Sequence, residues 1–234
     1  MSIRTITALT GLGLAASLAA ANTNQTSVQT QSFAGIPNFS GEFLFDQVNA
    51  ADFDPNPANV NLLGVQITAT ATISDGLLEG DNDGIDPAVI NSAELGASIA
   101  LTSDTLPLAL PGVSPVTSGS FNLAGNNGDG GTFDSQPLSE PDYDQLVGQN
   151  ITDIDLASFT GAFAAIFAGA GQFDIDYDAL SIFDFGGVGG VSFAGTPVNV
   201  DLEVEVVYTY KIVPAPAGLA AFGIFGLAAA RRRR

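Results

Sequence analysis

The most chemically suggestive stretch of this sequence is an acidic loop that contains glycine. Residues 79–86 read Glu-Gly-Asp-Asn-Asp-Gly-Ile-Asp, so carboxylates recur at short intervals. Ca²⁺ prefers oxygen ligands, and Gly84 permits the sharp turn that would bring them around one ion. The predicted Ca²⁺ ligands are Glu79, Asp81, Asp83 and Asp86. The alternative is a solvated acidic turn, because Ile90 stands where an EF-hand has its bidentate glutamate.

A second group of carboxylates follows a strand-like alternation. Asp174, Asp176 and Asp178 alternate with apolar residues, which predicts a strand with one apolar face and one carboxylate face. Such a face could hold a cation or a sugar. The alternative, which we favour, is a solvated face that prevents pairing between exposed strand edges.

The residue types that are absent narrow the chemistry. The chain contains no His, no Cys and no Trp. This excludes Ser-His-Asp and Cys-His catalysis and His-ligated zinc, and it excludes disulfides. Hydrolysis of glycans by a carboxylate pair is the one enzymatic alternative. Dense acidic residues supply such pairs by chance, so we expect no enzyme activity.

The charge distribution excludes one class of partner. All 25 acidic residues lie between Glu42 and Glu205, whereas Lys211 is the one basic residue outside the chain ends. The body between the ends therefore has a formal charge of about −24, which favours solubility. Nucleic acid is not an expected partner, because phosphate contacts require Lys and Arg.

The body reads as one all-β domain. Val60–Ser74 and Val198–Ile212 alternate apolar and polar residues, and turns rich in Gly, Pro, Asp and Asn separate such segments. This pattern predicts an antiparallel β-sandwich or jelly roll over residues 41–212. The sequence also predicts several local features. These are a flexible polar leader over residues 22–40, most polar in Asn22–Ser32; a short helix from Pro87 to Leu95; a helical turn within residues 139–147; a strand over Phe159–Phe167; and a bulge near Val206 and Val207.

The N-terminus has the organisation of a secretory signal peptide. Arg4 precedes a segment rich in Leu and Ala, which ends in Ala19-Ala20-Ala21. Small residues at Ala19 and Ala21 form a cleavage site of the A-x-A type, so we expect residues 1–21 to be removed.

The C-terminus combines three features. Val213-Pro214-Ala215-Pro216 precedes an apolar run, Ala217–Ala230, and the chain ends in Arg231–Arg234. Counted from Ile212, the apolar segment is about 28 Å long as a helix, just short of the bilayer's hydrocarbon core. The arginines would remain on the cytoplasmic side as a stop-transfer signal, namely Arg231, Arg232, Arg233 and Arg234.

This tail, residues 213–234, resembles the PEP-CTERM sorting domain of Gram-negative bacteria. The motif residues would be Val213, Pro214, Ala215 and Pro216, with Ala215 in place of the usual glutamate. The resemblance implies processing by an exosortase and transfer from the inner membrane to the cell surface or the exopolysaccharide matrix. The alternative is a single-pass membrane anchor that is never cleaved.

The sequence therefore predicts an exported structural protein of the cell surface or biofilm matrix. Its expected partners are the secretion machinery, an exosortase, the membrane and exopolysaccharide. The alternatives are a Ca²⁺-dependent carbohydrate-binding or adhesion module and, less favoured, a secreted glycan hydrolase.

Overall fold

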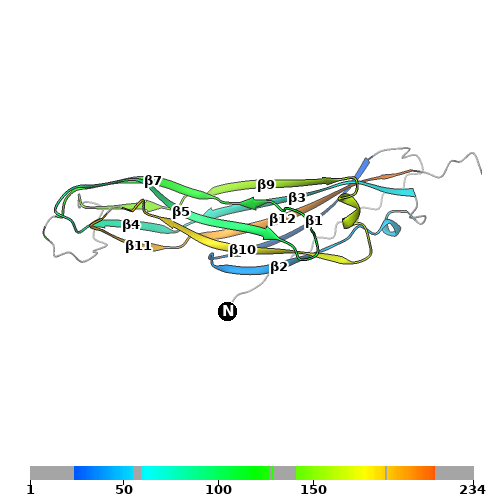
Figure 1. Ribbon diagram of the computed structural model, residues 1–234, viewed down its shortest axis with the longest axis horizontal. Helices are drawn as coiled ribbons and strands as arrows, with labels where there is room; N and C mark the ends of the chain where they lie inside the picture. The colour runs from blue at the N-terminus through cyan, green and yellow to red at the C-terminus, as the bar shows by residue number, and fades with distance from the viewer. Residues whose placement is uncertain (1–23, 55–58, 127, 129–140, 188, 214–234) are drawn as a thin grey trace, which may run out of the picture.

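A computed structural model describes residues 24–54, 59–126, 128, 141–187 and 189–213. The described chain is all-β, with antiparallel sheets, and the molecule is elongated (Figure 1). Its strands are β1 (Asn24–Gly35), β2 (Phe39–Asp46), β3 (Val60–Ser74), β4 (Leu77–Asn82), β5 (Ala88–Thr102), β6 (Gly112–Val113), β7 (Val116–Leu123), β8 (Tyr143–Val147), β9 (Ile151–Thr160), β10 (Gln172–Asp184), β11 (Val191–Thr196) and β12 (Asn199–Ile212). Two short 3-10 helices, η1 (Ala50–Asp52) and η3 (Ala164–Phe167), join strands.

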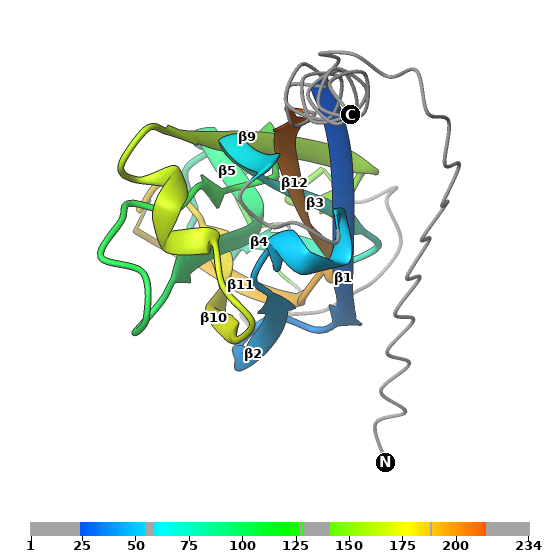
Figure 2. The ribbon, with the colours of Figure 1, turned by 90° about the vertical axis from the view of Figure 1, so that its right-hand side faces the viewer.

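Two large sheets form a β-sandwich, as predicted. One has the strand order β1-β12-β3-β9, and the other has the order β2-β10-β5-β6, with β7 also paired to β5. The view along the long axis shows these sheets on opposite sides of the core (Figure 2). A third sheet, β11-β4-β8, lies at one end of the molecule, and the chain leaves the described region near the other end (Figure 1).

The core follows from the alternation along the long strands. On β3 the odd-numbered side chains from Val65 to Ile73 are buried, and on β12 the even-numbered ones from Val200 to Tyr210 are buried. Aromatic side chains fill the space between the sheets; Phe45 stacks on Phe173 with ring centroids 5.7 Å apart. Burial of these apolar surfaces is the main source of stability in a chain without disulfides.

Several local predictions were wrong. The segment from Pro87 to Leu95 is not helical, because Ala88 begins β5. Tyr143–Val147 is a strand rather than a helical turn, and β9 ends at Thr160, so η3 replaces the end of the predicted Phe159–Phe167 strand. There is no parity slip at Val206: the register of β12 with β3 shifts between Thr209 and Tyr210.

The predicted flexible leader is a strand along most of its length. β1 pairs antiparallel with β12 from Asn24↔Lys211 to Gly35↔Val200. Its inward side chains are mainly polar. Gln29 donates from Nε2 to the Asp46 carbonyl (2.9 Å) and accepts at Oε1 from the Asp46 N–H (2.9 Å), and Gln31 donates to the Leu44 carbonyl. We call these contacts between β1 and β2 the glutamine seam.

The opposite side of the sandwich has a second seam, between β9 and β6. Asp153 Oδ2 accepts from the Ser114 N–H (2.7 Å), and Asp155 Oδ2 accepts from the Gly112 N–H (3.3 Å). We call this pair of contacts the aspartate seam. Side chains thus satisfy backbone groups at two sheet edges where no strand ladder continues.

The predicted signal peptide and most of the predicted sorting tail lie outside the described residues, including Ala19, Ala21 and everything from Pro214 to Arg234. Within the ranges that are described, no helix has both the length and the apolar character needed to cross a bilayer.

Candidate functional site: the acidic end sheet

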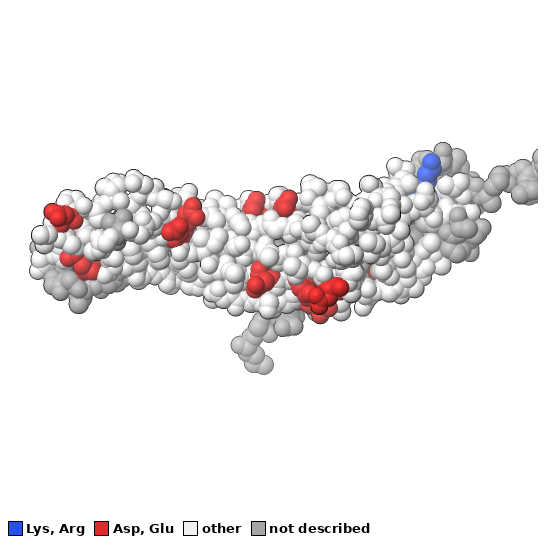
Figure 3. Space-filling model, viewed as in Figure 1, with Lys and Arg blue, Asp and Glu red and all other residues white. Residues whose placement is uncertain are grey.

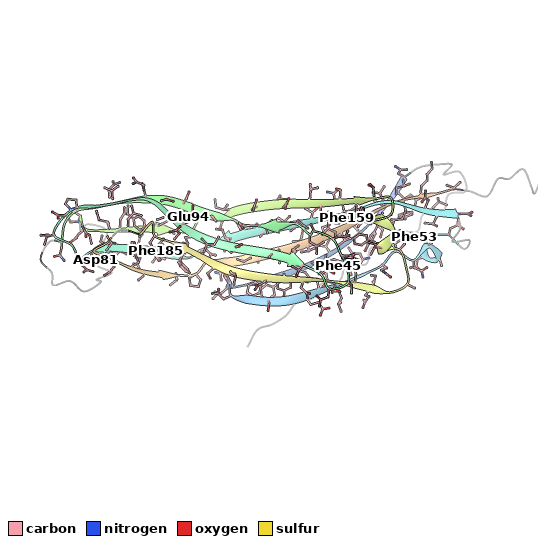
Figure 4. All side chains as sticks on the ribbon, in the orientation of Figure 1. Phe45, Phe53, Asp81, Glu94, Phe159 and Phe185 are labelled. Carbon is pink, nitrogen blue, oxygen red and sulfur yellow. The ribbon has the colours of Figure 1, made fainter. Side chains whose placement is uncertain are left out.

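The acidic loop predicted to bind Ca²⁺ belongs to the small β11-β4-β8 sheet. Figure 4 labels Asp81 at this end of the molecule and Phe53 near the other end. The first half of the loop is strand β4, so its side chains alternate between two faces. Glu79 and Asp81 share one face, and Asn82 points to the other. The backbone that carries Glu79 and Asp81 is therefore extended, and it does not curve around an ion as a ligand loop would.

Glu79 is engaged by a tyrosine from the neighbouring strand. The Tyr143 hydroxyl donates to Glu79 Oε1. Burial raises the pKa of Tyr143, and the hydrogen bond to Glu79 and the negative charges of Glu79, Asp144 and Asp81 raise it further. Tyr143 therefore remains protonated and is a stable donor to Glu79.

Asp81 and Asp83 lie beside β11. Asp81 is 4% exposed and is opposite Ser192 in the β4–β11 register. The Ser192 hydroxyl donates to Asp83 Oδ2, whereas Asp83 Oδ1 is buried without a hydrogen-bond partner among the described residues. A buried carboxylate oxygen without a donor is costly, which makes Asp83 the least satisfied carboxylate described at this end.

Asn82 organises the turn that follows β4. Its side chain, 1% exposed, donates to the carbonyls of Asp86 (2.8 Å) and Ala124 (2.5 Å) and accepts from the Gly84 N–H (3.0 Å). These bonds fix the turn and leave Ile85 90% exposed at its tip. Asn82 was predicted only as part of an acidic loop, although its role is to close a turn.

The four predicted ligands do not converge. Glu79 is bound to Tyr143, Asp83 is bound to Ser192, and the Asp86 side chain is exposed. Across the part of the chain that the structure describes, no three acidic side chains are grouped so that they could hold a metal ion. The Ca²⁺-dependent carbohydrate-binding alternative therefore has no metal cluster among those residues to support it.

The second carboxylate group is split between two environments. Asp174 is buried; its carboxylate accepts from Thr105 Oγ1 (2.5 Å) and from the Asp104 N–H (2.9 Å). Burial opposes ionisation, but these hydrogen bonds outweigh it and lower the pKa of Asp174. Burial and the charges of Asp174 and Asp104 instead raise the pKa of Asp176. Asp178 is exposed. The predicted carboxylate face is therefore wrong at Asp174, which anchors the chain between β5 and β6.

Charge on the visible surface is unevenly distributed. Figure 3 shows separate acidic groups along the molecule and one blue side chain near the end where the described chain terminates. Lys211 is the one Lys or Arg among the described residues. It lies on β12 opposite Asn24 of β1, so both ends of the described chain meet there.

The predicted sorting motif is described at its first residue only. Val213 follows β12, is 47% exposed, and donates its backbone N–H to the Asn59 carbonyl (2.7 Å). Backbone pairing therefore continues up to Val213, immediately before the first proline of the motif.

No family model matches the sequence, and no curated protein matches it. Among solved structures, a chain in the structure of the infectious bursal disease virus Gx strain is 14% identical over 86% of this chain and 43% of the viral chain, with a TM-score of 0.22. A chain of the VP2 subviral particle of the same virus is 13% identical over 82% of this chain and 42% of that chain, with a TM-score of 0.10. The chain spans less than half the length of these viral chains.

Proposed function

We propose that this protein is an exported, non-enzymatic structural protein of the bacterial cell surface or extracellular matrix, sorted by its C-terminal tail. The observation that carries the proposal is the position of Val213. Its backbone bond to Asn59 is the last described pairing, and Pro214 follows directly. A membrane-embedded processing enzyme requires a cleavage site outside the folded body, and the end of the described pairing one residue before Pro214 supports the proposal that the motif is such a site.

The shape of the molecule supports a structural role. The end sheet, with β4 and β11, lies at one end of the elongated sandwich, and β12 ends near the other (Figure 1). A rod tethered at one end would hold the acidic end sheet away from the membrane. Its negative charge would limit self-precipitation during export.

The strand orders support the finer prediction of a jelly roll. We take its eight strands, in chain order, to be β1, β2, β3, β5, β7, β9, β10 and β12. The first strand, β1, then pairs with the eighth, β12, and the second, β2, pairs with the seventh, β10. The third, β3, pairs with both the eighth, β12, and the sixth, β9. Two sheets of four connected in this way form a jelly-roll arrangement. We propose β4, β8 and β11 as additions that extend one end of it.

Mass spectrometry of the exported protein tests the sorting proposal. We expect the mature chain to begin at Asn22 and to lack the residues after Pro216. A Pro214→Ala and Pro216→Ala double variant should accumulate uncut in the membrane fraction. Pro87→Ala, in an exposed turn at the other end, is the matched control and should be processed normally. An intact, uncut wild-type chain in the cytoplasm would overturn the proposal.

A further inference from the structure

We propose that copies of this chain join to one another by exchanging β1, so that β1 of one copy pairs with β12 of the next. The inference goes beyond the proposed function, and it rests on four features of β1: its pairing, its inward side chains, its connection to β2, and its place in the chain.

β1 could pair with β12 of another copy without losing any of its backbone hydrogen bonds. Its 12 residues lie in unbroken antiparallel register with β12, from Asn24↔Lys211 to Gly35↔Val200. Strand addition at a sheet edge derives its affinity from such backbone bonds. Because copies are identical, β1 from a second copy would form the same ladder, and only the connection to β2 would differ.

The inward face of β1 suits a segment that spends time unpaired. Gln25, Ser27, Gln29 and Gln31 point inward, and Phe33 is the one large apolar side chain among the inward residues. Phe33 packs on Phe39 and Tyr177, with ring centroids 4.1 Å and 5.6 Å away. A free β1 therefore exposes one aromatic ring rather than a row of them, which keeps it soluble. In a second copy, the same ring would occupy the same position against β2 and β10.

The connection between β1 and β2 is short and constrained. Ile36, Pro37 and Asn38 carry the chain from one sheet to the other, and Asn38 has a left-handed backbone with φ of 75°. Asn38 is also fixed to β10: its N–H donates to the Ala179 carbonyl (2.6 Å), and its side chain pairs with Ser181. Short hinge loops under strain favour domain swapping, because the extended form relieves the turn.

The order of the chain delays pairing within one copy. β1 is the first described strand, and β12, its partner, is the last. Synthesis proceeds from the N-terminus, so β1 must wait until the rest of the domain is made. Closing that long loop is entropically costly and slow. The β12 edge of a neighbouring copy can compete during this interval, and the resulting contact repeats from copy to copy in an open series.

The absence of cysteine makes a direct test available. Ser32 and Glu203 are register partners with exposed side chains on the outer face of the sheet. Their Cα atoms are within disulfide range, because opposite residues in an antiparallel pair lie about 4.5–5.5 Å apart. Full-length S32C and E203C chains would be co-expressed in the producing cell, and exported protein would be run on non-reducing gels with mass spectrometry of the linked peptides.

We expect a disulfide-linked heterodimer of S32C and E203C chains, and a ladder of three or more copies from the S32C/E203C double variant. S32C with T152C is the control for random collision, because Thr152 is exposed on the same outer face but belongs to β9. If the double variant closes its disulfide within one chain and the mixed pair links no more than the control, the proposal is overturned. Failure to form either disulfide also overturns it.

The hinge gives a second, independent test. Insertion of Gly-Ser-Gly-Ser after Ile36 should relieve the turn and move the double-variant disulfide from between chains to within one chain. An unchanged ratio of intermolecular to intramolecular disulfide would contradict the role of the hinge. The mature termini, measured on the same samples, report sorting separately, so failure of strand exchange and failure of the proposed function can be told apart.

Discussion

The glutamine seam and the aspartate seam both satisfy backbone groups at a sheet edge, but one uses a side-chain amide and the other uses carboxylates. At both, a sheet edge would leave backbone groups without ladder partners. On β2, Asp46 exposes a backbone N–H and a carbonyl, and the Gln29 side-chain amide accepts from the first and donates to the second. At β6 and the residue after it, the N–H groups of Gly112 and Ser114 donate to carboxylates, which only accept. At each seam, the side chain matches the backbone groups that the facing edge presents.

The largest expected effect concerns the residue beneath the glutamine seam. Tyr208 is fully buried, and its hydroxyl donates to the same Asp46 carbonyl that Gln29 binds (2.7 Å). Tyr208→Ala should lower the free energy of unfolding by about 3–5 kcal/mol, because it leaves a large cavity. Tyr208→Phe should cost about 1 kcal/mol, which isolates the hydroxyl. Urea unfolding measures both, and a Phe variant as stable as wild type would show that this bond adds nothing.

Removal of the aspartate seam should have the next largest effect. Asp153→Ala with Asp155→Ala should cost about 1–3 kcal/mol, because two charge-assisted bonds to backbone N–H groups are lost. The matched control is Asp201→Ala with Glu203→Ala, two acidic residues on the outer face of β12. The control should change stability by less than about 0.5 kcal/mol.

The conservative pair Asp153→Asn with Asp155→Asn sharpens this test. Each amide oxygen can still accept from the β6 backbone, so most of the lost stability should return. Equal losses for the Ala and Asn variants would contradict the hydrogen-bond explanation of the aspartate seam.

At the glutamine seam we expect a smaller effect. Gln29→Ala should cost about 1 kcal/mol in urea unfolding, and Gln66→Ala, an exposed glutamine on the outer face of β3, should cost about half of that or less. Gln29→Glu should be no better than Gln29→Ala, because a carboxylate cannot donate to the Asp46 carbonyl and faces it with a negative charge. A fully stable Gln29→Glu variant would remove the distinction between the two seams.

The sequence predicted the sandwich but not its seams. Long alternating segments such as β3 and β12 bury one face, and their apolar residues reveal it directly. β1 has the same alternation, but apart from Phe33 its large inward residues are glutamines and a serine. Because polar side chains are usually exposed, this segment was predicted to be a flexible leader. The signal that could have been used was the period of two, with Gln29, Gln31 and Phe33 on one side.

The false helix at Pro87–Leu95 has an equally specific cause. The register between β5 and β7 shifts between Ile90 and Ala93, so two inward residues stand three apart, as they would on a helix. A bulge thus imitated helical spacing after an Asp-Pro start typical of a helix. At the acidic end sheet, composition identified carboxylates, but only the β4 pairing could show that Glu79 and Asn82 point to opposite faces.

Acid titration should distinguish the stability contributed by Asp174 from that contributed by the two seams. The pKa of Asp174 is lowered in the fold, below its ordinary value of 3.8, by the hydrogen bonds that outweigh burial. Its contribution is therefore complete above the unfolded pKa and is lost as pH falls through the folded pKa. Asp174→Asn should be less stable than wild type at pH 7, and the difference should shrink as pH falls below about 4. A difference that stays constant with pH would show that the ionised form contributes nothing specific.

The smallest expected effect is that of metal removal, and it contrasts the seams with the acidic end sheet. Carboxylates at the aspartate seam bind backbone N–H groups, and Glu79 and Asp83 at the end sheet bind hydroxyls. Neither arrangement gathers three carboxylates, so a chelator has no described cluster to empty. The thermal midpoint should be the same with EDTA and with excess Ca²⁺. A thermal midpoint that rises when Ca²⁺ is added to the wild type, but not when it is added to Asp83→Asn, would reinstate the predicted site. Asp83 Oδ1 is the buried oxygen that a cation would satisfy.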